Sequence, residues 1–117
     1  MATPEVPDGL LYGTLDILIL KALSWHSMHG YGISNWIRER SGGAVDLEDA
    51  ALYKALHRLE RDRAIASEWG RSENNRKARY YLLTPTGSQR LPAQTSAWKH
   101  YASLVSLLLD GPAGSRQ

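Results

Sequence analysis

Basic and amide side chains gather in one polar stretch of this chain, residues 70–78, with the sequence GRSENNRKA. Lys and Arg bind phosphate oxygens, and Asn offers donors to phosphates or base edges. Two runs typical of strands flank the stretch, about Ile65 to Trp69 and Arg79 to Leu83. The pattern predicts a β-hairpin with a cationic tip. Its nine-residue connection is long for a hairpin, so we expect the tip to become ordered on binding.

A second set of cations lies on a predicted helix from about Asp49, a possible cap, to Arg61. Three leucines share one face at spacings of i, i+4 and i+7, and three cations repeat this spacing on another face. An apolar face against a core and a basic face outside are what a helix in the DNA major groove requires. The leucines are Leu52, Leu56 and Leu59, and the cations are Lys54, Arg58 and Arg61.

The charge distribution agrees with this interpretation. The net charge is only +2, but residues 1–53 carry three Lys or Arg against seven Asp or Glu, whereas residues 54–79 carry eight against four. Positive charge therefore concentrates in the predicted helix and hairpin, as a phosphate-binding face requires. A charged segment is often merely a solvated surface, but here the charge coincides with a predicted helix and a predicted hairpin that are typical of DNA-binding proteins.

The predicted DNA contacts come from these two elements and from the start of an earlier helix. Several of these residues also have an alternative role. The cations of the hairpin would only add solubility, and Asn74 and Asn75 would only shape the turn. Tyr53 would pack beneath its helix, and His57 would make an intramolecular bond. The predicted set is Tyr31, Tyr53, Lys54, His57, Arg58, Arg71, Asn74, Asn75, Arg76, Lys77 and Arg79.

The elements that must position these residues precede the basic helix. A helix from about Thr14, its expected N-cap, to Trp25 is apolar almost all round and should be central. A second helix spans about Tyr31 to Arg40, and residues 44–47 suggest a short strand. We therefore expect a mainly α protein with a small β-hairpin (α+β). Residues 10–84 would form a winged helix-turn-helix, preceded by a loose arm at residues 1–9.

A long C-terminal helix, residues 85–109, is predicted after Thr84. Pro92 should kink or delay it, because proline removes a backbone hydrogen bond. Four apolar residues at 3, 4 and 3 spacing form a coiled-coil-like seam, which predicts a dimer interface rather than a third packed element of the same chain. Residues 110–117 are expected to be a frayed tail. The seam consists of Trp98, Tyr101, Val105 and Leu108.

Several classes of protein find no support in the sequence. The chain has 117 residues, enough for one domain, and no Cys, so it offers neither disulfides nor thiolate metal sites. His26 and His29 have no carboxylate beside them, so we expect no metal and no cofactor. No nucleophile elbow or phosphate-binding loop is present, so an enzyme is not expected. No signal peptide or membrane span is apparent, which predicts a cytoplasmic protein.

The motifs together resemble those of the PadR-type transcriptional regulators, in the short branch with a single C-terminal helix. They occur in family order over about residues 10–109. They are Gly13-Thr14-Leu15-Asp16, His29-Gly30-Tyr31-Gly32-Ile33, Leu52-Tyr53, Ala55-Leu56-His57-Arg58-Leu59-Glu60, Ser72-Glu73-Asn74-Asn75-Arg76-Lys77-Ala78-Arg79-Tyr80-Tyr81, and Leu83-Thr84 with Gly87.

This resemblance implies a homodimer that represses transcription by binding a palindromic operator in double-stranded DNA. It also implies that a small aromatic effector, which some members bind at the dimer centre, would lie near Trp98. Alternatively, Trp98 only fills the dimer core.

The chain departs from the family pattern in its recognition helix. Ala50, Ala51 and Lys54 stand where the family usually has Gly, then Ser or Thr, and Pro. Arg63 stands where Gly commonly ends the helix, and Arg in a left-handed conformation costs about 1 kcal/mol, so we expect this helix to end differently. These departures leave a second hypothesis open: a winged-helix dimer that acts as a protein-interaction module, or as a ligand sensor, with little DNA binding.

Overall fold

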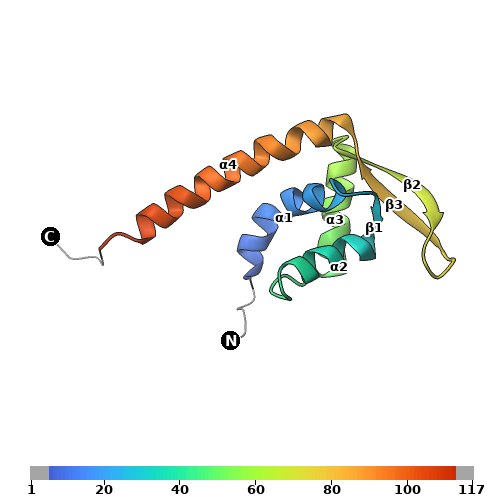
Figure 1. The fold of residues 1–117 in the computed structure, drawn as a ribbon, viewed down its shortest axis with the longest axis horizontal. Coiled ribbons are helices and arrows are strands. Elements are labelled where there is room, and N and C mark those ends of the chain that lie inside the picture. The colour runs from blue at the N-terminus through green and yellow to red at the C-terminus, as the bar shows by residue number, and fades with distance from the viewer. Residues whose placement is uncertain (1–5, 113–117) are drawn as a thin grey trace.

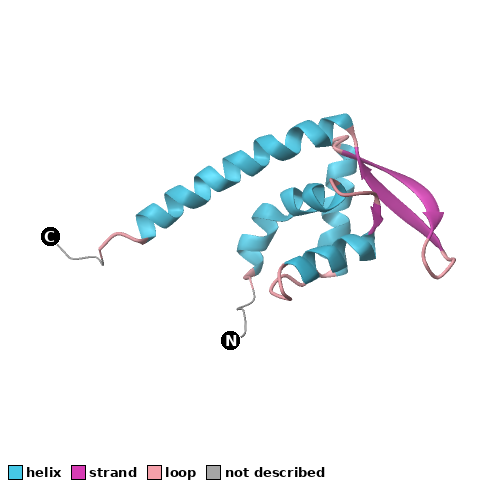
Figure 2. Cartoon of the chain, in the orientation of Figure 1, coloured by secondary structure: helices cyan, strands magenta, loops and turns pink. Residues whose placement is uncertain are grey.

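The computed structural model describes residues 6–112, which form four helices and a three-stranded antiparallel sheet (Figures 1 and 2). Three helices pack together beside the sheet, and the fourth runs past them and extends away from the body. The predicted α+β fold is therefore confirmed. The elements are α1 (Asp8–Leu23), β1 (Met28–His29), α2 (Gly30–Arg40), α3 (Asp49–Arg61), β2 (Ile65–Arg71), β3 (Lys77–Leu83) and α4 (Pro85–Leu109).

Helix α1 is central, as its sequence predicts, because Leu15, Ile19 and Leu20 are buried in the core. It begins at Asp8 rather than near Thr14, so the helix includes the last residues of the predicted arm, while residues 1–5 lie outside the described part. The carbonyl of Pro7 accepts the first helical bonds, and the extended backbone before a helix suits proline. The Thr14 hydroxyl is no N-cap, since it donates back to a carbonyl one turn earlier.

The first strand is formed by different residues from those predicted. Residues 44–47 are not a strand; instead Met28 and His29 pair with Tyr81 and Tyr80 of β3. Strand β3 thus has a partner on both sides, β1 on one and β2 on the other. The segment at 44–47 is held differently, because the Ala44 carbonyl accepts a hydrogen bond from the amide of Val6.

The strands of the β2–β3 hairpin are longer, and their connection is shorter, than predicted. Both strands extend toward the tip, so that only residues 72–76 connect them. The Ser72 amide donates to the Arg76 carbonyl at 2.9 Å, and the Asn75 amide donates to the Ser72 carbonyl at 2.9 Å. Asn75 has a φ of 57°, a left-handed conformation that Asn tolerates well. The tip therefore has a defined turn, and the prediction of a nine-residue connection was wrong.

Helix α3 ends with Arg63 in the left-handed conformation, at a φ of 62°. The expectation that Arg would force a different ending was wrong. Two bonds hold the backbone here: the Ala64 amide donates to the Leu59 carbonyl at 2.9 Å, and the Thr84 hydroxyl donates to the Arg63 carbonyl at 2.6 Å. The surrounding contacts thus offset a conformational cost of about 1 kcal/mol.

Helix α4 is continuous from Pro85 to Leu109, although Pro92 lies inside it. The start is fixed by Thr84, whose hydroxyl accepts a hydrogen bond from the Gly87 amide at 3.1 Å, and Pro85 suits the first helical position. Pro92 neither ends nor delays the helix, because one missing backbone bond leaves the cap and the remaining turns intact.

Gly87 is required where α4 passes over the end of α3. A Cβ atom at this position would lie 2.0 Å from the carbonyl oxygen of Ala64, which is backbone and has little freedom to move. Any larger residue must therefore push α4 away from the junction between α3 and β2.

We predict that Gly87→Ala lowers the free energy of unfolding by about 2–3 kcal/mol, as overpacking against fixed backbone does. Ser88→Ala is the matched control, because Ser88 is the next residue of the same helix and is exposed. Urea unfolding of both variants measures the difference. Equal stabilities for the two variants would contradict the close approach.

Candidate nucleic-acid interface

Helix α3 separates its apolar and basic faces as the sequence predicts. Leu52, Leu56 and Leu59 are buried, and they belong to the same core cluster as the apolar side of α1. Lys54 and His57 are exposed on the other side. Arg61 is exposed one turn further along and lines the same shallow groove on the outer face of the helix. No hydrogen bond of the His57 ring occurs within residues 6–112. The burial of the leucines thus directs the polar side chains away from the protein.

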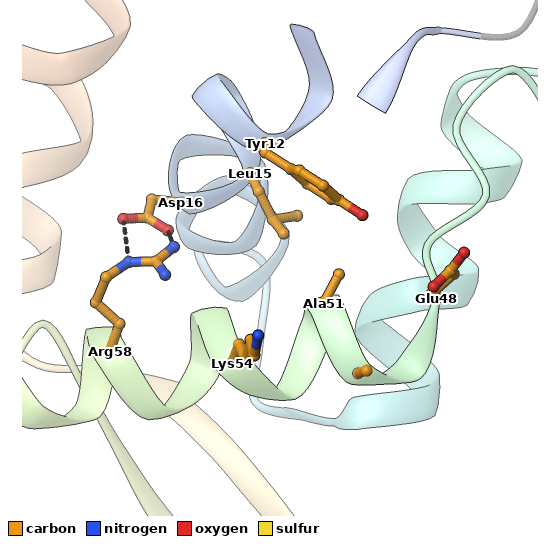
Figure 3. A pocket seen from close by; sticks show the side chains of 8 residues that line it. Tyr12, Leu15, Asp16, Glu48, Ala51, Lys54 and Arg58 are labelled. Atoms are coloured by element: carbon orange, nitrogen blue, oxygen red, sulfur yellow. Dashed lines mark hydrogen bonds and ion pairs between the residues drawn. The ribbon is translucent and has the colours of Figure 1, made fainter. Parts of the chain in front are cut away.

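Arg58 is the exception on this helix, because its guanidinium is bound to another helix. Both its Nε and Nη2 atoms donate to the carboxylate of Asp16 in α1 (Figure 3). This hydrogen bond raises the pKa of Arg58, so the side chain remains cationic. The carboxylate also lies 3.5 Å from Nη2 of Arg90 in α4. Asp16 therefore joins three helices, and the Arg58 side chain, 42% exposed, is held against α1 by this ion pair.

Lys54 differs from Arg58 in having no ion-pair partner within the described part of the chain. It lies at an open cleft between α1 and the first turns of α3, with Tyr12 on the opposite wall (Figure 3). Ala50 and Ala51 also line this cleft, and their small side chains leave the ammonium group accessible to a ligand.

The first turn of α2 lies beside α3 and is shaped by close contacts. Nδ1 of His29 accepts a hydrogen bond from the Gly32 amide at 2.9 Å. A Cβ at Gly30 would lie 2.4 Å from the hydroxyl oxygen of Tyr53, so the Tyr53 ring packs directly over Gly30. Tyr53 nevertheless keeps 46% of its surface exposed, and Tyr31 is more exposed still. Packing and phosphate contact are therefore compatible for Tyr53.

The hairpin places its cations on one face. In the strand register Trp69 pairs with Arg79 and Arg71 pairs with Lys77, so all four side chains project from the same face of the hairpin. Arg79 is partly engaged within the protein: its Nε donates to the Ser67 hydroxyl at 2.8 Å and its Nη2 lies 3.2 Å from Glu60 Oε2. Lys77 is free of ion pairs among the described residues and is thus more available to a phosphate.

The tip of the hairpin is polar and exposed. Asn75 shapes the turn through its positive φ, and its backbone carbonyl accepts a hydrogen bond from Arg71 Nη1 at 3.2 Å. Arg76 is exposed and, within residues 6–112, forms no ion pair. Asn74 borders a cleft between the hairpin and α2. The side chains of Asn74, Asn75 and Arg76 are all exposed, so each remains available for an external contact.

The cleft between the hairpin and the start of α2 brings several predicted residues together in a volume of about 440 Å³. Cations and aromatic rings line it together. Burial raises the pKa of Tyr81, so its phenol keeps its proton and stays a donor. The cleft thus offers cationic and neutral donors to a phosphate. It is lined by Tyr31, Tyr53, Asn74, Lys77, Arg79 and Tyr81, together with His29, Gly30, Trp69, Ser72 and Ala78.

The predicted seam of α4 is largely uncovered. Trp98, Tyr101 and Leu108 are exposed, and Val105 is half-buried. A small cavity of about 130 Å³ lies beside Trp98, where α4 passes α1. Ligand sites usually enclose about 300 Å³ or more, so this cavity by itself is small for a ligand.

Among residues 6–112, no group of three or more His, Cys, Asp or Glu side chains is arranged to hold a metal ion. Over the same residues, each helix is too short or too polar to cross a bilayer.

The helix-turn-helix, the basic outer face of α3 and the cationic hairpin define a winged-helix DNA-binding protein. Residues 19–93 match the model of the Transcriptional regulator PadR-like family, and the chain belongs to this family. Family membership confirms the prediction that this chain is a transcriptional regulator that binds DNA and not an enzyme.

Solved structures of related regulators have the same fold. A transcriptional regulator from Clostridium thermocellum is 27% identical, with a TM-score of 0.78 over 86% of this chain and 95% of its own. A PadR-like transcriptional regulator from Bacillus cereus is 25% identical, with a TM-score of 0.75 over 90% and 100% of the two chains. A PadR family transcription regulator from Clostridium difficile is 29% identical, with a TM-score of 0.72 over 83% and 99%.

Two residues of this region were missed in the sequence. Asp16 was identified only as part of a family motif, whereas it binds two arginines of other helices. Its partners are distant in the chain, so no local pattern indicated them. Trp69 was assigned only to a strand, although its alternation with Arg71 placed it on the cationic face.

We predict that Asp16→Asn lowers the free energy of unfolding by about 1 kcal/mol, because Arg58 loses its counter-ion and Arg90 keeps only the longer pair with Asp62. Asp46→Asn is the control: its ion pair with Arg38 spans 3.6 Å and its side chain is 65% exposed, so little change is expected. Urea denaturation distinguishes them. If both variants are as stable as the parent, Asp16 does not hold the three helices together.

Proposed function

We propose that this chain is a homodimeric transcriptional repressor that binds a palindromic operator. The observation that carries this proposal is the arrangement of exposed cations on α3 and the hairpin. Lys54 and Arg61 lie on the outer face of α3, while Lys77 and Arg76 lie on the hairpin. A helix in the major groove and a hairpin beside it would use these two sets together.

The proposed contacts divide into two kinds. Lys54 and His57 would reach base edges, since they project from the outer face of α3. Arg71, Arg76 and Lys77 would bind phosphates through the hairpin, with Asn74 and the phenols of Tyr31 and Tyr53 as further donors. Arg58 and Arg79 would contribute mainly by orienting α3 and the hairpin, because each is bound to a carboxylate of the protein.

The dimer is proposed from the apolar surface of α4. The C-terminal half of this helix extends away from the other elements (Figure 1), and large apolar side chains remain exposed along it. A two-fold partner would bury this surface and place two copies of α3 about one DNA turn, roughly 34 Å, apart. The exposed set includes Trp98, Tyr101, Leu104, Leu107, Leu108 and Leu109.

Repression follows from the size of such a dimer, which would occupy a promoter and exclude polymerase. A small aromatic effector would bind between the protomers near Trp98, where the partner's surface would enlarge the small cavity of one chain. By changing the distance between the two copies of α3, the effector would alter DNA affinity from a separate site.

Selection of bound duplexes from a random pool tests the function directly. The expected result is a palindrome with half-site centres about 10 base pairs apart, bound with an affinity that falls steeply as salt rises. Recovery of no preferred sequence, or weak binding without salt dependence, would contradict a sequence-specific repressor.

We predict that Lys54→Ala weakens binding to the selected operator by about 1–3 kcal/mol, more than it weakens binding to scrambled DNA, as loss of a base contact does. Lys99→Ala is the control, because Lys99 is an exposed cation on α4, away from the proposed DNA contacts. Titration of labelled duplexes measures both affinities. An equal loss on operator and scrambled DNA would make Lys54 a phosphate contact.

We predict that Val105→Asp produces monomers and abolishes tight operator binding, because a charge enters the buried seam while the hairpin is unchanged. Sedimentation of parent and variant at micromolar concentration measures assembly. Ser106→Asp is the control, since Ser106 is exposed and lies outside the seam. A monomeric parent, or a Val105→Asp variant that still binds the palindrome tightly, would refute the dimer.

A further inference from the structure

Trp69 is an exposed aromatic residue on the cationic face of the hairpin. Its side chain is 62% exposed, although tryptophan is normally well covered. The Lys77 ammonium lies 4.8 Å from the centre of its ring, and the Arg79 guanidinium lies 6.0 Å from it. The ring therefore lies beside two cations, while much of its surface remains free.

The face that carries Trp69 is directed toward the other DNA-binding elements. Trp69 lines the same cleft as Tyr31 and Tyr53, which come from α2 and α3. The acidic neighbour Glu68 projects from the opposite face of the hairpin, because successive residues of a strand alternate. The free surface of the ring thus lies beside Lys77 and Arg79 and away from Glu68, and the Glu60 carboxylate on this side is bound to Arg79.

A nucleic-acid backbone has the chemistry that this arrangement fits. Its phosphates attract the two cations, and the sugars between phosphates present apolar C–H groups to an aromatic ring. The indole N–H is a donor only, which suits a phosphate or sugar oxygen. A neutral ligand would make no use of Lys77 and Arg79, and a basic protein surface would be repelled by them.

We propose that Trp69 is a direct DNA contact. Its indole packs against a deoxyribose of the strand whose phosphates bind Lys77 and Arg79. This inference rests on the proposed binding of DNA by the hairpin and adds an apolar contact that carries no charge. The contact strengthens binding to every sequence, because all nucleotides share the same sugar.

Salt dependence separates an apolar contact from an ionic one. We expect Trp69→Ala to weaken binding to operator and scrambled duplexes alike by about tenfold, the order expected when part of one aromatic side chain is no longer buried. The slope of log affinity against log salt should stay unchanged, because no counter-ion release is lost. Lys77→Ala should instead flatten this slope by roughly one unit in each protomer. Trp69→Phe, which keeps a ring, should retain most of the affinity.

Trp25→Ala is the matched control. Trp25 is 57% exposed and also lies against a cation, with the Arg40 guanidinium 5.0 Å from its ring. It contacts the C-terminal end of α2, whereas the proposed site is at the N-terminal end. Its replacement should leave DNA affinity unchanged. Urea unfolding of each variant verifies that the fold is retained.

Intrinsic fluorescence gives a second measurement on proteins that retain all their other tryptophans. DNA should change the emission of the parent and of Trp25→Phe, and this change should be largely lost in Trp69→Phe.

Unchanged affinity in Trp69→Ala would overturn the inference. A flattened salt slope in that variant would also overturn it, since Trp69 would then only position the cations. If the parent itself binds no DNA, the proposed function fails; if only the Trp69 results differ from expectation, the function stands without this contact.

Discussion

Burial of the leucine face of α3 against α1 is the constraint on which the rest of the structure depends. Leu52, Leu56 and Leu59 join Leu15 and Ile19 in one core, and this packing fixes the rotation of α3 about its axis. Once the rotation is fixed, the polar side chains between the leucines must project outward. The same hydrophobic contact that stabilises the domain therefore also exposes the surface that is proposed to face DNA.

Two further contacts connect this helix to its neighbours. The Asp16 carboxylate binds Arg58 of α3 and Arg90 of α4, so the recognition helix and the proposed dimer helix share one counter-ion. At the end of α3, Gly87 of α4 lies against the Ala64 carbonyl, which permits a close approach that a side chain would prevent. A movement of α4 would therefore be transmitted to α3 through both ionic and steric contacts.

The hairpin combines rigidity with an exposed binding face. A turn with defined hydrogen bonds closes it, and Asn75 takes the left-handed conformation that this turn requires. On the strands, Arg79 is held by Ser67 and Glu60, whereas Lys77 remains free beside the ring of Trp69. One face of the hairpin thus carries both a side chain that orients it, Arg79, and a side chain that is available to a ligand, Lys77.

The sequence by itself determined the elements that depend on local periodicity and local chemistry. The leucine spacing predicted α3 from Asp49 to Arg61, and Thr84 with Pro85 marked the start of α4. It did not determine what depends on distant partners. β1 forms at Met28 because β3 offers a free edge there. Arg63 keeps a left-handed conformation because hydrogen bonds to Thr84 and Leu59 hold the backbone around it. Arg58 binds Asp16, which lies 42 residues earlier in the chain. Only the tertiary structure decided these features, because each is stabilised by a contact between segments that are far apart in the chain.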